Sequence, residues 1–445
     1  MKKAYIRTFG CQMNVYDTGK MLALLKNDGY EETLEMNDAD LVIVNTCSIR
    51  EKPELKVHSF LGEARKIKRN RPGKNMTIAI SGCVAQQEGK NLLNRYPDVN
   101  LVFGPDAVPN ISTLLSATHN QKQVLDTTFL DEADYVFASD IDPNATQRVG
   151  AFVTIQKGCD NKCTFCIVPT TRGKEVSRPS EQIVAEVRAL VDQGIKEITL
   201  IGQNVNSYGL KKSGEKTFAQ LLYAVADVPG VERIRYTTSH PRDMGLDVMQ
   251  AYRDLPQLCS QLHLPVQSGS SRILRRMKRF YTRERYLEVV DQLRAARPDI
   301  VLSTDFIIGF PGETDEDFAQ TMSLLEEVRF HSSFSFKYSE RPGTPALKLV
   351  AKTPVDQILA GERLMHLQKR QRAIAQEEHN LLEGMVVPVL VEGPSRHDEG
   401  VICGRTHTFK TVNFPGDVSW VGQTHHIRIT KAFANSLRGE AVGAR

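Results

Sequence analysis

The chain has 445 residues, which at roughly 150 residues per domain suggests about three domains. A hydrophobic content of 41% and a charged content of 25% exclude a mainly disordered, collagen-like or coiled-coil protein, and a net charge of +4 is too small to indicate a polyanionic partner by itself. The 8 cysteines are too few for a disulfide-held secreted scaffold, and the chain shows neither a signal peptide nor an apolar run of membrane-spanning length. We therefore expect a cytoplasmic protein with no membrane segment, whose reduced cysteines are free to bind metal.

The first 120 residues alternate predicted strands with predicted helices. Candidate strands at 4–9, 41–44 and 77–80 are separated by stretches with helical spacing of apolar residues, which predicts a parallel α/β sheet. A cysteine follows each strand at an even spacing of 36 residues, and the three are Cys11, Cys47 and Cys83. Each would lie just beyond the carboxyl end of its strand, the edge at which open α/β sheets bind ligands.

One cysteine after one strand would be a small core residue. Three of them on one edge of a parallel sheet predict instead the ligands of an iron–sulfur cluster. Because three thiolates leave one iron of a 4Fe–4S cluster without a protein ligand, such a cluster could bind an exogenous sulfur or methylthio group.

A polar stretch at 121–148 predicts a linker, after which a second α/β series begins. Its clearest helix is predicted at 182–193, where apolar residues form one stripe. Six strands, each followed by a helical pattern, predict an incomplete (β/α)6 barrel rather than a second open sheet. These candidate strands span 152–156, 197–202, 233–237, 261–266, 302–308 and 333–338.

Basic residues gather in two stretches. Residues 65–74 carry six lysines and arginines with no acid, and residues 272–285 carry seven with a single glutamate. Such runs are often solvated faces, but they could also neutralise phosphates, and the sequence leaves both interpretations open.

The last part of the chain changes character. Residues 357–383 have the pattern of a long polar helix that ends at Gly384. Short β-rich runs at 386–391, 400–405, 410–414 and 425–430 then predict a small five-stranded barrel of the OB type. The expected domains are an α/β domain at 1–120, a linker at 121–148, a core barrel at 149–375, and the helix end with the small barrel at 376–445.

The strongest motif follows the first barrel strand, where Cys159, Cys163 and Cys166 are separated by three and then two residues. Three thiolates on one short loop can hold three corners of a 4Fe–4S cluster and leave the fourth iron open to a substrate. A structural zinc site is the alternative, but it needs a fourth ligand at matching spacing, and the next cysteine, Cys259, is far away. Cys259 and Cys403 stand alone and receive no role.

This triplet, with Phe165 before its last cysteine, resembles the signature of the radical S-adenosylmethionine (SAM) superfamily, whose fold is an incomplete (β/α)6 barrel. The resemblance implies that SAM binds the open iron and is cleaved by electron transfer to a 5′-deoxyadenosyl radical. Residues at the ends of later strands, where barrel sites are built, would complete the SAM pocket. They are Gly202, Gln203 and Asn204, in the place of the superfamily's Gly-Gly-Glu motif, together with Thr238, Ser239, Gln267 and Asp305.

Two three-cysteine sets, an N-terminal α/β domain and a C-terminal β-barrel resemble the methylthiotransferase family over essentially the whole chain. The segments 10–14, 45–51 and 82–86 are similar to the subgroup that acts on isopentenyladenosine in tRNA, whereas Thr170 and Glu340 depart from its usual residues. The tail resembles the TRAM domain, an RNA-binding barrel, and a generic β-barrel appendage is the alternative.

The resemblance implies a transferase that methylthiolates carbon 2 of isopentenyladenosine at position 37, in the anticodon stem-loop of tRNA. It implies two 4Fe–4S clusters, with SAM as both methyl donor and radical source, and a low-potential electron donor such as a flavodoxin or ferredoxin. A monomer is expected. The alternatives are methylthiolation of threonylcarbamoyl-adenosine in tRNA or of a ribosomal protein and, from another class, a non-catalytic iron–sulfur sensor that binds RNA.

Overall fold

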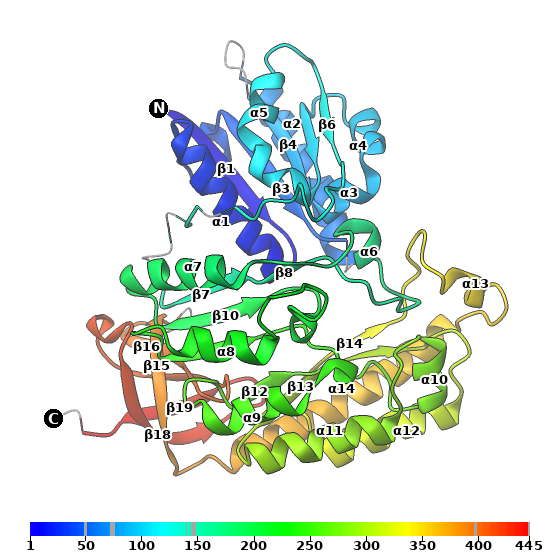
Figure 1. Cartoon of the computed structure of the whole chain (residues 1–445), viewed down its shortest axis with the longest axis vertical. Helices are drawn as coiled ribbons and strands as arrows, with labels where there is room; N and C mark the ends of the chain where they lie inside the picture. The colour runs from blue at the N-terminus through cyan, green and yellow to red at the C-terminus, as the bar shows by residue number, and fades with distance from the viewer. Residues whose placement is uncertain are drawn as a thin grey trace.

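The computed structural model describes residues 1–48, 51–71, 76–138, 140–142, 144, 148–395 and 398–443, with the backbone alone at 51–56. Within them the chain builds an N-terminal α/β sheet, a central barrel and a small C-terminal barrel (Figure 1), so the expected fold class is confirmed. Residues 49–50 of the 45–51 segment, 72–74 of the first basic stretch, and parts of the expected linker lie outside the described residues. No helix in the described ranges is long and apolar enough to cross a membrane.

The N-terminal sheet is parallel throughout, with the strand order β2-β1-β3-β4-β5-β6. Its strands are β1 (Lys2–Thr8), β2 (Tyr30–Glu32), β3 (Leu41–Thr46), β4 (Thr77–Gly82), β5 (Leu101–Phe103) and β6 (Val124–Asp126). Because the chain winds outward in opposite directions from β1 and β3, the crevice at their carboxyl ends is the switch point at which such sheets bind ligands.

Helices cover both faces of this sheet, and each face has its own core. Residues of one core come from α1 (Gln12–Asn27) and α5 (Ile111–Ala117), and residues of the other come from α2 (Glu51–Arg69), α3 (Cys83–Glu88) and α4 (Lys90–Arg95). The central strand β3 is buried along its whole length, as its run of apolar residues predicts.

The central barrel has six parallel strands in two three-stranded sheets, β11-β10-β7 and β12-β13-β14. The strands are β7 (Gly150–Thr154), β10 (Glu197–Ile201), β11 (Arg233–Tyr236), β12 (Gln261–His263), β13 (Val301–Ile308) and β14 (Ser332–Lys337). A single bridge between Ile234 and Leu258 joins the two sheets. In the described part of the chain β7 and β14 do not pair, so the barrel is open on that side.

Helices pack on the outside of the barrel, and alternate strand residues point at them. These residues, which include Val153, Ile198, Ile234, Leu302 and Phe306, form the largest core of the molecule. The helices are α7 (Ser180–Asp192), α8 (Phe218–Ala226), α9 (Leu246–Asp254), α11 (Arg283–Ala296), α12 (Asp315–Val328) and α14 (Gln357–Asn380), with the short α6 (Val168–Thr171), α10 (Ser271–Arg276) and α13 (Leu347–Val350) at the loops. The intervening strand residues form what we call the inner face of the barrel.

The C-terminal barrel is closed, with the order β15-β16-β17-β19-β18. Its strands are β15 (Val386–Pro394), β16 (Val401–Thr406), β17 (Thr411–Pro415), β18 (Thr424–Ala432) and β19 (Leu437–Ala441). It docks at the amino-terminal ends of the central strands, where Arg233 donates to the carbonyl of Arg405 at 2.6 Å and Arg235 donates to that of Thr406 at 2.9 Å. The short antiparallel pair β8 (Gln156–Lys157) and β9 (Val176–Ser177) lies at the opposite end, beside the first loop.

A buried ionic network fixes the N-terminal body against the central barrel. Lys20 of α1 lies 2.9 Å from Glu186 of α7, and Tyr16 donates a hydrogen bond to the same carboxylate at 3.2 Å. Arg178 also pairs with Glu186, so two buried cations share one buried carboxylate.

Candidate functional site

Two glycines allow the N-terminal cysteine set (Cys11, Cys47 and Cys83) to converge at the switch point. Gly10 has a φ of +145°, and a Cβ there would lie 2.5 Å from the Cβ of Cys47. Gly82 has a φ of +89°, and a Cβ there would lie 2.4 Å from the carbonyl oxygen of Thr46. Only glycine permits this close approach of neighbouring strand ends.

Two buried asparagines lock the first two cysteines of this set together. Asn14 donates to the side-chain oxygen of Asn45 at 2.9 Å and to the carbonyl of Thr46 at 2.9 Å, and Asn45 donates back to the carbonyl of Asn14 at 2.8 Å. The thiol of Cys11 lies 3.3 Å from Asn14 Oδ1. The start of α1 is therefore held against the end of β3, so that Cys11 lies at hydrogen-bonding distance of Cys47.

A cation from the central barrel lies beside these sulfurs. Arg172, just after α6, is buried, pairs with Asp17 at 2.8 Å and lies at hydrogen-bonding distance of Cys83. The hydrogen bond from Cys47, aided by the charge of Arg172, lowers the pKa of Cys11 to about 6. Burial raises the pKa of Cys83, and Arg172 opposes that rise. The set thus favours the thiolate form at Cys11, and thiolates are the form that binds metal.

The barrel cysteine set (Cys159, Cys163 and Cys166) is held by backbone contacts on both sides of its loop. Gly158, with a φ of +71°, lies so close to the carbonyl of Lys174 that a Cβ would clash at 1.9 Å. The amide of Thr164 donates to Met277 at 3.0 Å and its carbonyl accepts from Ala346 at 2.9 Å. Burial raises the pKa of Cys166 to about 12 and also raises that of Cys159.

A second buried arginine, Arg279, lies beside the barrel cysteine set. Arg279 donates to the sulfur of Cys163 at 3.3 Å, while its other nitrogens bond the carbonyl of Pro265 and the hydroxyl of Tyr281 at 3.1 Å each. Each cysteine set therefore has one buried guanidinium beside it, which stabilises anionic sulfur in a low-dielectric site.

Three arginines of the second basic stretch, 272–285, are paired with carboxylates. Arg272 pairs with Asp317, Arg283 with Glu327 and Arg285 with Glu288. Arg279 points at the barrel cysteines. In the first stretch, Arg65 and Arg69 both pair with Asp98.

The residues expected to form the SAM pocket lie around the mouth of the barrel, with different partners. Gln203 accepts a short hydrogen bond from the amide of Gly158, so its side chain supports the cysteine loop. Asn204 donates to Asp243 at 2.8 Å, which leaves its own Oδ1 buried without a partner in the described structure. Gly202 lets the chain pass Gln156, whose Cβ lies 3.3 Å from where a Gly202 Cβ would be. Phe165 packs edge-on against Phe310, at 6.5 Å between ring centres.

Two further features of the barrel mouth fit a polar ligand. Ser239 Oγ and both amide atoms of Gln156 are buried and have no hydrogen-bond partner among the described residues. Thr238 and Gln267 adopt positive φ angles of 70° and 77°, an uncommon conformation for such side chains. Unsatisfied buried polar atoms and backbone strain are features that gather at ligand sites.

Asp305 lies on the inner face of the barrel, one strand away from His263. Asp305 Oδ1 is 3.4 Å from His263 Nε2, and the other ring nitrogen of His263 is 3.0 Å from Ser303 Oγ.

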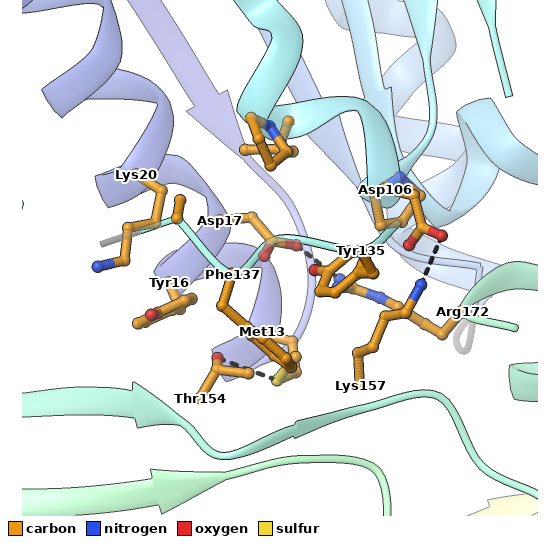
Figure 2. Close-up of a pocket in the computed structure, with 14 residues that line it drawn as sticks. Met13, Tyr16, Asp17, Lys20, Asp106, Tyr135, Phe137, Thr154, Lys157 and Arg172 are labelled. Carbon is orange, nitrogen blue, oxygen red and sulfur yellow. Dashed lines mark hydrogen bonds and ion pairs between the residues drawn. The ribbon is translucent and has the colours of Figure 1, made fainter. Parts of the chain in front are cut away.

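A pocket lies between the N-terminal body and the central barrel, and we call it the junction pocket (Figure 2). Its lining comes from α1, the segments after β5 and β6, and the barrel, and it includes the ion pairs Arg172–Asp17 and Lys157–Asp106. Lys157, two residues before Cys159, lies 2.5 Å from Asp106 and 3.8 Å from the ring centre of Tyr135. The pocket therefore brings together Arg172, which lies beside Cys83, and Lys157, which is two residues before Cys159.

Tyr135 and Phe137 show that the expected linker has a structural part. Phe137 is buried, and the two rings pack edge-on at 4.9 Å between their centres. The stretch also contributes β6 to the N-terminal sheet. Its polar composition concealed these contacts, because three aromatic residues scattered in a long acidic segment give no periodic signal.

Both cysteine sets fit three-ligand iron–sulfur clusters by their donor chemistry. Among the described residues no three histidine, cysteine or carboxylate side chains are grouped to hold one metal ion. In a cubane each thiolate binds a different iron, so the sulfurs stand further apart than the ligands of a single ion. The neighbouring arginines and the folded glycine turns supply what anionic clusters need around their ligands.

Arg172, Arg279, Asp17 and Lys157 were not identified from the sequence. Arg172 is six residues past Cys166 and Lys157 is two residues before Cys159, so proximity to the motif was the available signal. Arg279 was hidden in the basic stretch, where all seven cations look alike.

Three family models match the chain. They are the Radical SAM superfamily at residues 153–325, the Uncharacterized protein family UPF0004 at residues 3–104 and the TRAM domain at residues 381–442.

Curated relatives match over nearly the full length. A protein of Bordetella bronchiseptica named tRNA-2-methylthio-N(6)-dimethylallyladenosine synthase is 47% identical over 449 residues, covering 99% of this chain and 92% of that protein. Proteins of the same name from Geobacter metallireducens and Agrobacterium fabrum are 47% and 45% identical, covering 99% and 100% of this chain and 98% of each relative.

Solved structures share the fold at low identity. TsrM, a radical S-adenosylmethionine methyltransferase from Kitasatospora setae solved with cobalamin and a 4Fe-4S cluster bound, gives a TM-score of 0.57 at 13% identity, covering 79% of this chain and 75% of that chain. The cobalamin-dependent S-adenosylmethionine radical enzyme OxsB gives 0.55 at 12% identity, covering 83% and 56%.

Proposed function

The chain belongs to the family of the tRNA-2-methylthio-N(6)-dimethylallyladenosine synthases, and on that premise we propose that it methylthiolates carbon 2 of isopentenyladenosine at position 37 of tRNA. It is a radical SAM transferase, and membership of that superfamily implies SAM and a 4Fe–4S cluster. The observation that carries the proposal is the presence of two three-cysteine sets, each at a loop edge of its own sheet and each with a buried arginine beside it.

The reaction requires radical chemistry because the target C–H bond is inert. The hydrogen on carbon 2 of the adenine ring is neither acidic nor adjacent to a leaving group, so general acid–base chemistry cannot activate it. When bound, the two clusters and SAM would supply methyl transfer to sulfur and one-electron removal of that hydrogen, with SAM as methyl donor and as radical source.

The two sets divide the cofactors between them in this proposal. The barrel set holds the cluster that binds SAM, and Gly202, Asn204, Ser239 and Gln267 surround SAM, with Phe165 behind the loop and Asp305 at the border between SAM and the target nucleotide. Gln203 acts indirectly, by fixing Gly158. The N-terminal set holds the second cluster, which carries the sulfur that is transferred.

The remaining residues of the junction pocket exclude water and balance charge. Arg172 lies beside Cys83 and pairs with Asp17, and Lys157 pairs with Asp106 beneath the ring of Tyr135. Reactive intermediates survive only where water is excluded, and these paired, buried groups give a dry wall without an uncompensated charge.

The RNA substrate is an anticodon stem-loop in this proposal. Its loop bases are unpaired and can be splayed out into a pocket, as RNA-modifying enzymes require. The closed C-terminal barrel, which matches the TRAM model, would contribute to RNA binding. The enzyme would act as a monomer, with electrons from a low-potential donor such as a flavodoxin or ferredoxin.

The test combines tRNA analysis with SAM cleavage. Mass spectrometry of tRNA nucleosides from a deletion strain should show loss of 2-methylthio-isopentenyladenosine and accumulation of isopentenyladenosine, restored by the wild-type gene but not by a Cys159→Ala copy. Loss of methylthio-threonylcarbamoyl-adenosine instead, or of a ribosomal-protein modification, would move the substrate to one of the alternatives.

The sensor alternative is separated by a second measurement. The reduced, anaerobically reconstituted protein should form 5′-deoxyadenosine from SAM, and formation should stop in the Cys159→Ala variant. A wild-type protein that binds RNA but yields no 5′-deoxyadenosine would be a sensor rather than an enzyme.

A further inference from the structure

The strand β14 places two phenylalanines on the inner face of the barrel. In its register with β13, Phe334 lies opposite Asp305 and Phe336 lies opposite Ile307. Paired residues of parallel strands point to the same side of a sheet. The alternate residues of β13, among them Leu302 and Phe306, belong to the core under the helices, so Phe334 and Phe336 face inward, away from those helices.

Both rings are exposed to solvent, although they face the inside of a barrel. Phe334 is 49% exposed and Phe336 is 39% exposed. Because β14 is the last strand and does not pair with β7 in the described structure, the inner face opens to solvent beside these rings. Two large aromatic side chains exposed side by side on one strand form an apolar wall, and such a patch marks a binding site more often than a chance exposure.

A polar group lies against the lower end of this wall. The ring of His263 packs edge-on against Phe334, with 5.9 Å between ring centres. The same histidine lies 3.4 Å from Asp305 and 3.0 Å from Ser303. Carboxylate, imidazole and hydroxyl groups together offer both hydrogen-bond donors and acceptors next to an aromatic surface.

The upper end of the wall reaches the barrel cysteine set. Ile307, which shares its register position with Phe336, packs in one cluster with Phe165 and Phe310. The segment that follows β14 returns to the cysteine loop, where Ala346 donates to the carbonyl of Thr164. The wall is therefore continuous with the loop that carries Cys159, Cys163 and Cys166.

We propose that Phe334 and Phe336 form the wall that receives the adenine base and isopentenyl chain of the target nucleotide, with Asp305 and His263 at the polar edge of the ring. This proposal rests on the proposed function and names the residues that would hold its substrate. An isopentenylated adenine combines a flat aromatic ring, a branched apolar chain and ring nitrogens. The wall offers stacking and apolar contact, and the Asp305–His263 pair offers hydrogen bonds to the nitrogens.

The test measures RNA affinity and SAM affinity separately, on the reconstituted full-length enzyme. The probes are a fluorescent anticodon stem-loop carrying isopentenyladenosine, the same loop with plain adenosine, and SAM alone. The variants are Phe334→Ala, Phe336→Ala and the volume-conserving Phe334→Leu. Ser335→Ala is the matched control, because Ser335 alternates with both rings and faces the opposite side of β14.

Wild type should bind the isopentenylated loop more tightly than the plain loop. Each alanine variant should weaken binding of the isopentenylated loop by roughly 5- to 100-fold, the range expected for one lost aromatic stacking partner. Phe334→Leu should fall between alanine and wild type, while Ser335→Ala should bind normally. SAM affinity and iron content should stay at wild-type levels in all four.

Two results would overturn the inference. One is unchanged RNA affinity in both alanine variants and in Phe334→Leu. The other is loss of SAM affinity with normal RNA affinity, which would assign the wall to the adenine of SAM. A wild-type enzyme that does not distinguish the two loops would count against the proposed substrate itself, whatever the variants do.

Discussion

Arg172 belongs to the central barrel, yet its guanidinium lies among groups of the N-terminal body. It pairs with Asp17 at 2.8 Å and lies at hydrogen-bonding distance of Cys83, and its charge also acts on Cys11. This single side chain therefore links the placement of the second cluster to the barrel that holds the first.

Replacing Arg172 should uncouple the two sites. In Arg172→Met, SAM cleavage to 5′-deoxyadenosine should persist, because Arg279 still lies beside the barrel set. The amount of methylthiolated product per 5′-deoxyadenosine should fall by about 10- to 100-fold, the range expected when a residue that supports metal ligands is lost. Arg172→Lys should recover only part of the product ratio, because an ammonium group cannot reproduce the planar hydrogen-bonding geometry of a guanidinium. Product ratios from mass spectrometry and the midpoint potential of the second cluster measure the effect.

The loss of stability caused by Arg172→Met can be separated from its effect on sulfur transfer. Removing Arg172 leaves Asp17 buried without its partner, which should destabilise the fold by about 3–5 kcal/mol in urea unfolding. Adding Asp17→Asn should restore most of that stability but not the product ratio. Arg188→Met, at an exposed position of α7, should change neither quantity. A wild-type product ratio in Arg172→Met would mean that its charge has no part in sulfur transfer.

At this scale the sequence predicted the positions of the cysteines and missed what surrounds them. Cys11 and Cys83 each follow a glycine near a strand end, and this local pattern is visible in the sequence. Arg172 and Asp17 meet only after 155 residues of chain have folded between them. Arg279 could not be told from its basic neighbours, because burial, which singles it out, is a property of the tertiary structure.

The contact between the C-terminal barrel, β14 and α14 is built from buried bases. Lys410 Nζ lies 3.1 Å from His331 Nδ1, just before β14, and His379 near the end of α14 bonds the carbonyl of Phe433 at 2.6 Å. Burial lowers the pKa of Lys410 to about 8 and that of His331 to about 3. His407, which accepts from the amide of Ser260 at 3.0 Å, has its pKa lowered by burial to about 4.

This contact should weaken in acid. As pH falls below about 6.5, the unfolded chain protonates its histidines while His331 and His407 stay neutral in the folded state, so the free energy of unfolding should fall by about 1.4 kcal/mol per pH unit for each of them, until pH 4 is reached. Above pH 6.5 neither histidine contributes a slope. Urea unfolding of the iron-free protein at pH 7.0, 6.0 and 5.0 measures this.

Substitution of His331 and His407 tests whether these two histidines cause the loss of stability in acid. The double variant His331→Gln/His407→Gln should flatten the pH dependence by about half or more in this window, whereas His119→Gln, at an exposed position after α5, should leave the slope unchanged. An unchanged slope in the double variant would assign the acid sensitivity to other groups, such as His240, whose pKa burial lowers to about 2.

Element prediction succeeded where strands were long and failed where they were short. All six barrel strands and β1, β3 and β4 lie close to the expected ranges, and all of them except the three-residue β12 have four or more residues of apolar or alternating pattern. The strands β2, β5 and β6 have three residues each and were missed, and β19 carries charged residues that hide its alternation. Tertiary pairing, rather than local preference, makes these segments strands.

On the scale of the whole molecule, each cysteine set is assembled by its own body. Asn14, Asn45 and the glycine turns hold the N-terminal set with contacts inside the N-terminal sheet, while the barrel set depends on Gln203, Met277 and Ala346 of the barrel. The junction pocket adds charge and closure between them but no sulfur ligand. The two sites should therefore load with iron independently, although they act on one substrate.

Iron and sulfide analysis of anaerobically reconstituted protein tests that independence. Wild type should hold about eight irons, four in each cluster. The triple variant Cys159→Ala/Cys163→Ala/Cys166→Ala and its counterpart at Cys11, Cys47 and Cys83 should each keep about four, because neither body supplies a ligand to the other. A Cys259→Ala/Cys403→Ala variant is the matched control and should keep about eight. If removing either triplet abolished all iron binding, the two sites would be one cooperative assembly. If wild type held only four irons, the N-terminal set would not carry a cluster, and the source of the transferred sulfur would have to lie elsewhere.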